Sequence, residues 1–319
     1  MRAGPRRLQR RITEHTDRNE ESVSTIAFIG LGIMGNPMAC HFARAGHTVI
    51  GYNRSPGRAA ALIEAGGTEA DSIADAVKDA DVVAVMVPDS PDVQTVLLSE
   101  GGVFANARAE TLVIDFSSIR PDITAQLAKE ATERGLRLID APVSGGEAGA
   151  KNATLSIMVG GTDEDFAAAE PFLEIVGKTV VHVGPNGAGQ TVKAANQLIV
   201  AGNIELLAEA INFLRAYGVD LDAAVKVLGG GLAGSAVLDQ KASKMLSRNF
   251  DPGFRIELHH KDMGIVTSAA REAGAAIPLG AVVAQLMASA LANGDGSLDH
   301  SGLLRGVERL SGHTEGGTQ

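Results

Sequence analysis

The glycine motif Gly30-Leu31-Gly32-Ile33-Met34-Gly35 constrains the fold of this chain more than any other feature. It ends a short apolar run, TIAFIG from Thr25, that is typical of a buried parallel strand. A stretch of helical character from Asn36 to Ala45 comes directly after it. A strand, a G-x-G-x-x-G turn and a helix in this order are typical of the first βαβ unit of a Rossmann fold. We therefore expect the loop and the helix N-terminus to hold the pyrophosphate of a dinucleotide.

Strand-like and helical segments alternate through the first half of the chain. Further strands are expected in the runs HTVIGYN, DVVAVMVP, TLVIDFSS, RLIDAPVS, TLSIMVGG and TVVHVG, with helical stretches between most of them. This alternation predicts an α/β fold with a doubly wound parallel sheet and helices on both of its faces. We expect this N-terminal Rossmann domain to span 24–185.

The pattern changes at the turn-rich stretch GPNGAG, beyond which no strand is expected. A long helix is expected over 190–217, and its apolar character on most sides indicates burial between other helices. Polar residues interrupt this helix at Asn203, Glu205, Glu209 and Asn212. They disfavour a membrane span, because charge is costly in lipid. Further helical segments are expected near 221–228, 234–246, 257–273, 278–292 and 299–311.

These helical segments predict an all-helical domain for substrate binding and oligomerisation over 186–319. Its apolar surfaces suggest a homodimer or a homotetramer. The net charge of −10 and the 3 % aromatic content, with no Trp, argue against nucleic-acid binding. The single Cys40 has no partner for an internal disulfide, which fits the reducing cytoplasm. We read Cys40 as a small buried residue.

The first residues, 1–23, differ from the rest of the chain. Arginines cluster early, acidic residues follow, and there is almost no apolar run. A secretory signal needs a hydrophobic core and a transit peptide is poor in acids, so neither fits. We expect a disordered extension, with an over-extended start as the alternative.

The second expected strand ends in Asn53-Arg54-Ser55, where many NAD-binding proteins carry an acid. The Arg54 guanidinium would pair with a 2′-phosphate, and the Asn53 and Ser55 side chains would donate hydrogen bonds to it. This favours NADPH, with NAD possible. In the alternative, Arg54 points to solvent and both cofactors are used.

Four segments, in order, resemble the signature segments of the β-hydroxyacid dehydrogenases: GLGIMGNPMA at 30–39, DAPVSGG at 140–146, GQTVKAANQ at 189–197 and HKDMG at 260–264. The segment KAANQLIVAGNIELLAEA resembles the tartronate semialdehyde (2-hydroxy-3-oxopropionate) reductases within that family. The resemblance covers about 24 to 312. It implies reduction of tartronate semialdehyde to D-glycerate with NAD(P)H.

Other functions remain open at this point. Within the family, the alternatives are a 3-hydroxyisobutyrate dehydrogenase and a succinic semialdehyde/glyoxylate reductase. From another class, the alternative is a non-catalytic dinucleotide-binding assembly module. Lys193 and the acidic net charge disfavour that module, because relatives of that kind have lost the catalytic lysine.

Lys193 is the expected general acid/base of the reaction. Hydride addition to an aldehyde leaves negative charge on oxygen, and a positioned acid must protonate that oxygen. The Lys193 ammonium carries protons, and partial burial beside another cation would lower its pKa toward working pH. Asn196 lies three residues on, so it shares a helix face with Lys193 and would orient either the lysine or the substrate oxygen.

Further site residues follow from position and from the resemblance. Ser144, Gly145 and Gly146 follow the end of a strand, where doubly wound sheets bind ligands, and would hold the substrate carboxylate. The resemblance places Lys261 near the nicotinamide and the substrate, as a residue that binds both. It also places Val87, Pro88 and Ser118 beside the adenosine and the nicotinamide ribose.

The histidines do not point to a metal site. His259, His260 and His300 lack the spacing of a known ligand motif, and the resemblance implies no metal. We expect solvated or capping histidines.

Overall fold

Strand β1, Thr25–Ile29, lies at the centre of the first part of the molecule. In the computed structural model, which describes residues 23–312, both faces of this strand are covered. Phe28 packs into the core on one face of the sheet, and its neighbour Ile29 packs into the core on the other. A strand that is buried on both faces is apolar at every position, which explains the continuous apolar run.

The sheet has the strand order β3-β2-β1-β4-β5-β6-β8-β7, with β9 paired to β8. Its remaining strands are β2 Thr48–Tyr52, β3 Thr68–Glu69, β4 Val82–Val85, β5 Leu112–Asp115, β6 Arg137–Asp140, β7 Val143–Ser144, β8 Leu155–Gly160 and β9 Gly177–Gly184. The chain order reverses between β1 and β4, which makes their carboxyl ends a topological switch point where such sheets bind ligands. The expected Rossmann fold is confirmed.

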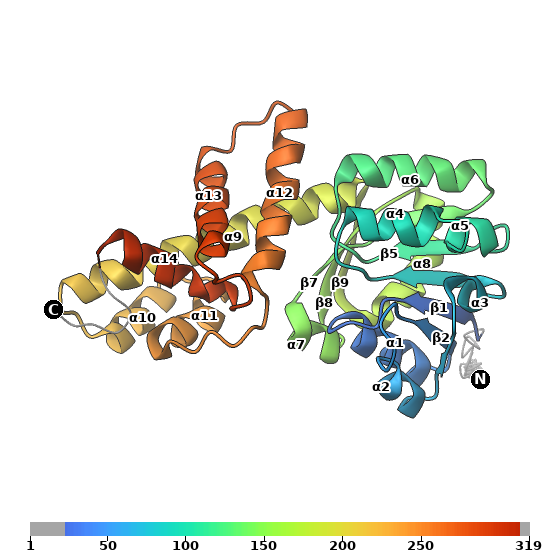
Figure 1. Cartoon of the computed structure of the whole chain (residues 1–319), viewed down its shortest axis with the longest axis horizontal. Helices are drawn as coiled ribbons and strands as arrows, with labels where there is room; N and C mark the ends of the chain where they lie inside the picture. The colour runs from blue at the N-terminus through green and yellow to red at the C-terminus, as the bar shows by residue number, and fades with distance from the viewer. Residues whose placement is uncertain (1–22, 313–319) are drawn as a thin grey trace, which may run out of the picture.

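Helices cover both faces of this sheet (Figure 1). They are α1 Gly35–Arg44, α2 Ala60–Glu64, α3 Ile73–Val77, α4 Ser90–Leu98, α5 Val103–Asn106, α6 Pro121–Glu133, α7 Gly146–Lys151 and α8 Asp163–Val176. Buried residues of α1, α2, α7 and α8 share one core, and those of α3 to α6 share the other. The sequence indicated no element where α4 and α5 lie.

The expectation of a wholly parallel sheet was wrong at one edge. Strands β1 to β6 run parallel, but β8 pairs antiparallel with both β6 and β7. Only the six-residue α7 and short turns join β7 to β8, and a parallel crossover needs about a dozen residues or more. The expected single strand RLIDAPVS is also split into β6 and β7 at Ala141-Pro142.

The second part of the molecule is all-helical, as expected. It contains α9 Ala188–Ala216, α10 Leu221–Gly229, α11 Ala236–Ser247, α12 Ile256–Glu272, α13 Pro278–Ala292, the 3₁₀ turn η1 His300–Gly302 and α14 Leu303–Leu310. Figure 1 shows α9 leaving the sheet domain and running through the helical domain, where the other helices pack around it.

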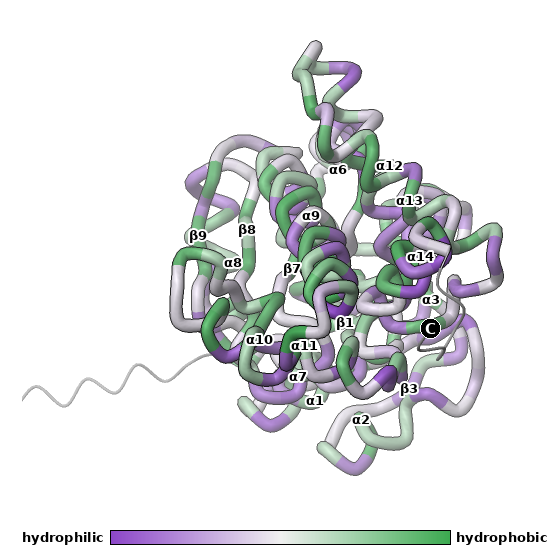
Figure 2. Tube along the Cα trace, turned by 90° about the vertical axis from the view of Figure 1, so that its left-hand side faces the viewer, coloured by the Kyte–Doolittle hydropathy of each residue, from purple (hydrophilic) through white to green (hydrophobic). Residues whose placement is uncertain are grey.

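Helix α9 contacts the sheet domain at β8 and β9 and enters the core of the helical domain. Its residues Ala201, Ile204, Ala208 and Ile211 are buried in the core of the helical domain. By length and composition α9 is the one described helix that could cross a membrane, yet this packing is that of a core helix. Figure 2 shows hydrophobic and hydrophilic residues interleaved along its tube. The expected extension 1–23 lies outside the described residues, apart from Val23.

Candidate active site

The glycine loop between β1 and α1 is shaped by close backbone contacts. Gly30 has φ +104°, and a Cβ there would lie 2.1 Å from the Met86 carbonyl oxygen. A Cβ on Gly35 would lie 1.9 Å from the Gly30 carbonyl oxygen, so helix and strand approach too closely for a side chain. At Gly32, by contrast, a Cβ would meet nothing within 4 Å. The backbone of Gly32 is therefore open to a bound group, which fits a dinucleotide pyrophosphate.

The N-terminus of α1 is free to bind an anion. Its N-cap, Met34, makes no side-chain capping hydrogen bond, and no acidic residue lies in the first turn. The first N–H groups of a helix and its dipole favour a negative charge at this position. Leu31 is buried behind the loop and Ile33 is exposed on it. The residues Gly30 to Gly35 thus fit the phosphates of a nicotinamide dinucleotide.

Asn53 braces the glycine loop. Its Oδ1 accepts a hydrogen bond from the Leu31 N–H at 2.9 Å, and its Nδ2 donates to the Ser55 carbonyl oxygen at 2.8 Å. Its Nδ2 carries two N–H groups, so one remains for the contact to a 2′-phosphate that the sequence suggested. The side chain of Arg54 is 84 % exposed, and its Nη1 lies 3.3 Å from the Asp92 carboxylate on α4.

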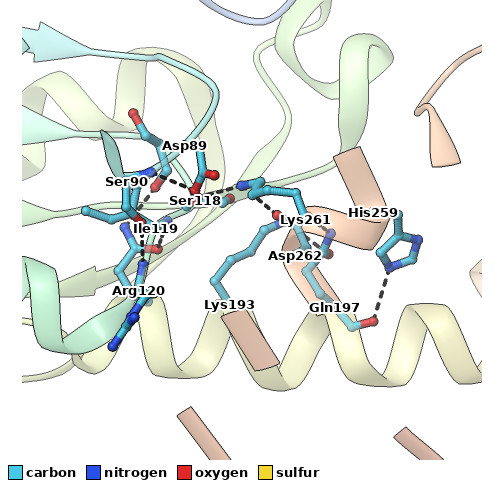
Figure 3. A network of polar contacts seen from close by, with 12 residues as sticks. Asp89, Ser90, Ser118, Ile119, Arg120, Lys193, Gln197, His259, Lys261 and Asp262 are labelled. Carbon is cyan, nitrogen blue, oxygen red and sulfur yellow. Dashed lines mark hydrogen bonds and ion pairs between the residues drawn. The ribbon is translucent and has the colours of Figure 1, made fainter. Parts of the chain in front are cut away.

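The carboxyl ends of β4 and β5 lie beside the loop. The Val87 N–H donates to Ser117 Oγ at 3.0 Å, so the turn after β4 is tied to the turn after β5. Pro88 is exposed beside it. The Ser118 carbonyl oxygen accepts a hydrogen bond from Lys261 Nζ at 2.6 Å, which bridges the two domains (Figure 3).

Lys193 lies in the first turns of α9 with its side chain buried and only 9 % of its surface exposed. Its Nζ donates to the Val143 carbonyl oxygen at 2.8 Å and to Gln197 Oε1 at 3.1 Å. An ammonium has three N–H donors, so one remains for a substrate oxygen. Val143 directly precedes Ser144, which places Lys193 at the base of the expected carboxylate-binding turn. Gly145 and Gly146 are exposed in that turn, and both have positive φ.

Burial lowers the pKa of Lys193 to about 8. The nearby Asp262 carboxylate raises this pKa, and the nearby Lys261 ammonium lowers it. Burial disfavours the charged form of an amine, and a like charge disfavours it further. A lysine with a pKa near 8 exchanges protons readily near neutral pH, which suits a general acid/base.

Gln197 is the site residue that sequence reasoning missed. Its Oε1 accepts from Lys193, and its Nε2 donates to Asp262 Oδ2 at 2.5 Å. The Asp262 carboxylate also forms an ion pair with Lys261, with Oδ1 and Nζ 2.8 Å apart. Asn196, which was expected to orient either Lys193 or the substrate oxygen, donates to Gln197 Oε1 at 2.8 Å. The signal was present in the sequence, because residues four apart share a helix face as well as residues three apart do.

Two buried side chains fix the N-terminus of α9. The Asp140 carboxylate, at the end of β6, accepts from the Gly187 N–H at 2.8 Å and from the Gln190 N–H at 2.9 Å. Gln190 in turn donates to the Ser117 carbonyl oxygen at 2.8 Å and accepts from the Ile119 N–H at 3.0 Å. The helix that carries Lys193 is therefore held against the strand ends that line the cofactor loop.

The histidines were expected to be solvated or capping, and this was wrong for two of them. His259 and His300 are buried in the helical domain, with their Nδ1 atoms 3.0 Å apart. Burial lowers the pKa of both histidines, that of His259 to about 4, so the pair is uncharged near neutral pH. Within residues 23–312, no group of three or more His, Cys, Asp or Glu is placed to hold a metal ion.

A small pocket of about 10 Å³ lies where these groups meet, which is space for one water molecule. It is lined by Ser118, Ile119, Gln190, Lys193, Ala194, Gln197, Asp262 and Ile265. Lys193 and Ser118 both line this pocket, and Lys261 lies beside it through its hydrogen bond to the Ser118 carbonyl oxygen. Gly30 to Gly35 and Arg54 lie in the sheet domain, at the ends of β1 and β2.

Two family models match the chain. Residues 25–184 match the NAD-binding domain of 6-phosphogluconate dehydrogenase, and residues 187–307 match the model described as NAD-binding of NADP-dependent 3-hydroxyisobutyrate dehydrogenase. Together they cover most of the chain. The sheet domain is thereby assigned to nicotinamide dinucleotide binding.

Individual relatives agree with these models. The chain is 40 % identical to the 2-hydroxy-3-oxopropionate reductase of Escherichia coli, over 90 % of this chain and 98 % of that protein. It is 35 % identical to the NAD-dependent L-serine dehydrogenase of Pseudomonas aeruginosa, over 91 % of this chain and 99 % of that protein.

Among solved structures, 3-hydroxyisobutyrate dehydrogenase of Mycobacterium tuberculosis with L-serine superposes with a TM-score of 0.82. It is 33 % identical and covers 89 % of this chain and 99 % of its own. The chain therefore belongs to the 3-hydroxyisobutyrate dehydrogenase-like β-hydroxyacid dehydrogenase family, and is an NAD(P)-dependent oxidoreductase of β-hydroxyacids.

Proposed function

We propose that this enzyme is a cytoplasmic reductase that converts tartronate semialdehyde to D-glycerate, reversibly and with NADPH as the preferred reductant. The observation that carries the reaction type is the buried Lys193 ammonium, which has a free N–H at the cleft between the domains. The substrate rests on the 40 % identity to a 2-hydroxy-3-oxopropionate reductase and on the resemblance of the α9 segment to that group.

Lys193 is the acid in the proposed mechanism. A bound nicotinamide supplies the hydride to the aldehyde carbon. Lys193 Nζ donates a hydrogen bond to the carbonyl oxygen, stabilises the negative charge that develops there, and transfers its proton to that oxygen. Gln197 holds Nζ in place through its Oε1, and Asp262 holds the Gln197 amide. In the oxidation direction, neutral Lys193 removes the hydroxyl proton.

The substrate carboxylate has two groups of donors in this proposal. Ser144, Gly145 and Gly146 supply a hydroxyl and unobstructed N–H groups, and Lys261 supplies an ammonium. The pocket at Lys193 has room for a single water, so we expect Lys261 to leave the Ser118 carbonyl oxygen when the substrate enters.

A spectrophotometric screen tests the substrate. Tartronate semialdehyde, succinic semialdehyde, glyoxylate, 3-hydroxyisobutyrate and L-serine would each be assayed at 340 nm with both nicotinamide cofactors. We expect the highest kcat/KM for tartronate semialdehyde. A higher value for 3-hydroxyisobutyrate or L-serine would overturn this substrate and leave the lysine mechanism intact.

The pH dependence of the reaction follows from the Lys193 pKa. Reduction needs protonated Lys193, so its kcat/KM should fall as pH rises through about 8, and oxidation should rise over the same range. The Asp262 carboxylate raises this pKa, so Asp262→Asn should lower it. The falling limb of the reduction profile and the rising limb of the oxidation profile should then both move to lower pH. Rate profiles from pH 6 to pH 10 measure the shift.

A matched control separates this effect from a loss of structure. Asp222 is an exposed acid on α10, and Asp222→Asn should leave the limbs where they are. The position of the limb, not the height of the profile, is the readout, because Asp262 also anchors Gln197 and Lys261. A limb that moves upward in Asp262→Asn would contradict the assignment to Lys193.

Cofactor preference is tested at Arg54 and at its partner Asp92. Arg54→Ala should raise the KM for NADPH about tenfold and leave the KM for NADH nearly unchanged, because a charge-assisted contact to the 2′-phosphate is lost. Asp92 competes for the same guanidinium, so Asp92→Asn should lower the KM for NADPH about twofold to fivefold, as expected for an exposed ion pair. Equal effects on both cofactors would reject a role in 2′-phosphate recognition.

We also propose that the enzyme is a homodimer or a homotetramer. Large apolar side chains are exposed along one face of α9 at intervals of seven residues: Val192, Ile199, Leu206 and Phe213. A stripe with this spacing is typical of a seam between packed helices. Light scattering of the purified chain measures the oligomeric state, and a monomer at micromolar concentration would reject the proposal.

A further inference from the structure

A second cavity lies in the helical domain, away from the cleft that holds Lys193. It has a volume of about 230 Å³ and lies where α9, α13 and α14 meet. Its lining is Glu205, Leu286, Ser289, Asn293, Leu303, Gly306, Val307, Arg309 and Leu310. Figure 1 shows α13 and α14 beside α9, on the side of the molecule remote from the sheet. Glu205 and Lys193 share α9, and a helix rise of 1.5 Å per residue separates them by about 18 Å.

Glu205 contributes a buried carboxylate to the wall of a cavity that mixes apolar and polar residues. Its side chain is 3 % exposed, and within the part of the chain that the structure describes its Oε2 has no hydrogen-bond partner. A buried carboxylate without a partner is costly, because it loses its water and gains no compensating donor. Burial raises the pKa of Glu205 to about 7, and the neighbouring Glu209 carboxylate raises it further.

The rest of the lining fits the apolar part of a small ligand. Leu303 and Val307 are buried, and Leu286 is half-buried, whereas Ser289 and Asn293 are exposed at the rim. Arg309 also lines the cavity, and its guanidinium forms an ion pair with the Asp295 carboxylate. The cavity therefore combines a carboxylate acceptor, an apolar wall and a polar entrance.

We propose that this cavity binds a small organic ammonium ion, whose N–H groups donate to Glu205 and whose short alkyl chain packs on Leu303 and Val307. An ammonium is the donor that an unpaired carboxylate lacks, and charge-assisted hydrogen bonds are stronger than neutral ones. The cavity volume holds an alkyl chain of a few carbons. The site is separate from the active site, and its existence does not depend on the identity of the substrate.

Calorimetric titration of the full chain at pH 8 with propylammonium chloride tests the proposal, since Glu205 is then mainly ionised. We expect saturable binding that tightens about threefold to fourfold for each methylene added from methylammonium to propylammonium. Neutral 1-propanol, which has nearly the same shape, should bind at least tenfold more weakly. Binding by 1-propanol as tight as by propylammonium, or no saturable binding by either, would overturn the proposal.

Three variants locate the site. Glu205→Gln should weaken propylammonium binding at least tenfold, because the charge-assisted contact is lost. Glu209→Gln is the matched control, since it removes the same charge from an exposed position on α9, and it should bind nearly as well as the wild type. Gly306→Leu keeps Glu205 but fills the cavity, because a Cβ at Gly306 would meet nothing within 4 Å, and it should also abolish binding. Unchanged binding in both Glu205→Gln and Gly306→Leu would place the ammonium elsewhere and reject this site.

Thermal unfolding gives an independent readout on Glu205. The folded-state pKa of Glu205 lies above its ordinary value, so the ionised side chain destabilises the fold above pH 7 and has no effect below about pH 4. Glu205→Gln should therefore raise Tm at pH 8 and leave it nearly unchanged at pH 4. A lower Tm at pH 8 would show that the carboxylate already has a partner in solution, and would overturn the proposal.

Discussion

Lys193→Met should lower kcat/KM for semialdehyde reduction by about 10² to 10⁴-fold, the usual contribution of a positioned general acid. Methionine keeps most of the buried volume but has no proton to donate and no charge to stabilise the developing alkoxide. The Val143 carbonyl oxygen and Gln197 Oε1 would lose the hydrogen bonds that they accept from Lys193 Nζ, so some loss of stability is expected as well. Initial rates at 340 nm, with substrate below KM, measure the effect.

The control for this substitution is Lys226→Met. Lys226 is an exposed lysine on α10, and its replacement should leave kcat/KM within about twofold. Cofactor affinity, followed by the fluorescence of bound NADPH, should be retained in Lys193→Met, because the glycine loop lies in the other domain. Near wild-type turnover in a folded Lys193→Met enzyme would refute the assigned role, and would reopen the possibility of an assembly module without catalysis.

Gly32→Ala should weaken dinucleotide binding by about tenfold to a hundredfold without destabilising the fold. A methyl group at this position meets no protein atom within 4 Å, so the protein itself accommodates it. The same methyl group would occupy the space into which the pyrophosphate must come, and overpacking costs about 1–3 kcal/mol. Titration with NADPH and with NADH gives the affinities, and thermal unfolding gives the stability.

Gly35→Ala should instead act mainly on stability, because it destabilises the fold even without a bound dinucleotide. Its Cβ would lie 1.9 Å from the Gly30 carbonyl oxygen, so the backbone of the loop must move. We expect a clear loss of Tm in the absence of cofactor. Gly101→Ala is the control, because Gly101 also has open space around it and lies outside the proposed cofactor site. If Gly32→Ala bound NADPH as tightly as the wild type, the loop would not be the pyrophosphate site.

The sequence predicted the sheet domain well because its signals are local. A strand buried on both faces must be apolar throughout, and a loop that approaches a neighbouring strand must be glycine, as the Gly30 and Met86 contact shows. The helical segments were predicted for a similar reason, since each carries an apolar stripe for one core. The direction of β8 was predicted wrongly, because it depends on how far the short α7 can carry the chain.

Some features of the candidate site were likewise predictable from local sequence patterns, and others depended on the tertiary structure. The sequence by itself determined the glycine loop, the lysine on α9 and the family, because each is carried by contiguous residues with a distinctive pattern. The tertiary structure decided that Gln197, not Asn196, contacts Lys193, that Asp262 stands behind Gln197, and that Asn53 braces the loop. Some of these contacts join residues that are far apart in the chain. Others depend on which of two neighbouring positions on one helix face makes the contact. Such choices depend on which side chain the packed neighbouring element meets, and no local pattern encodes that.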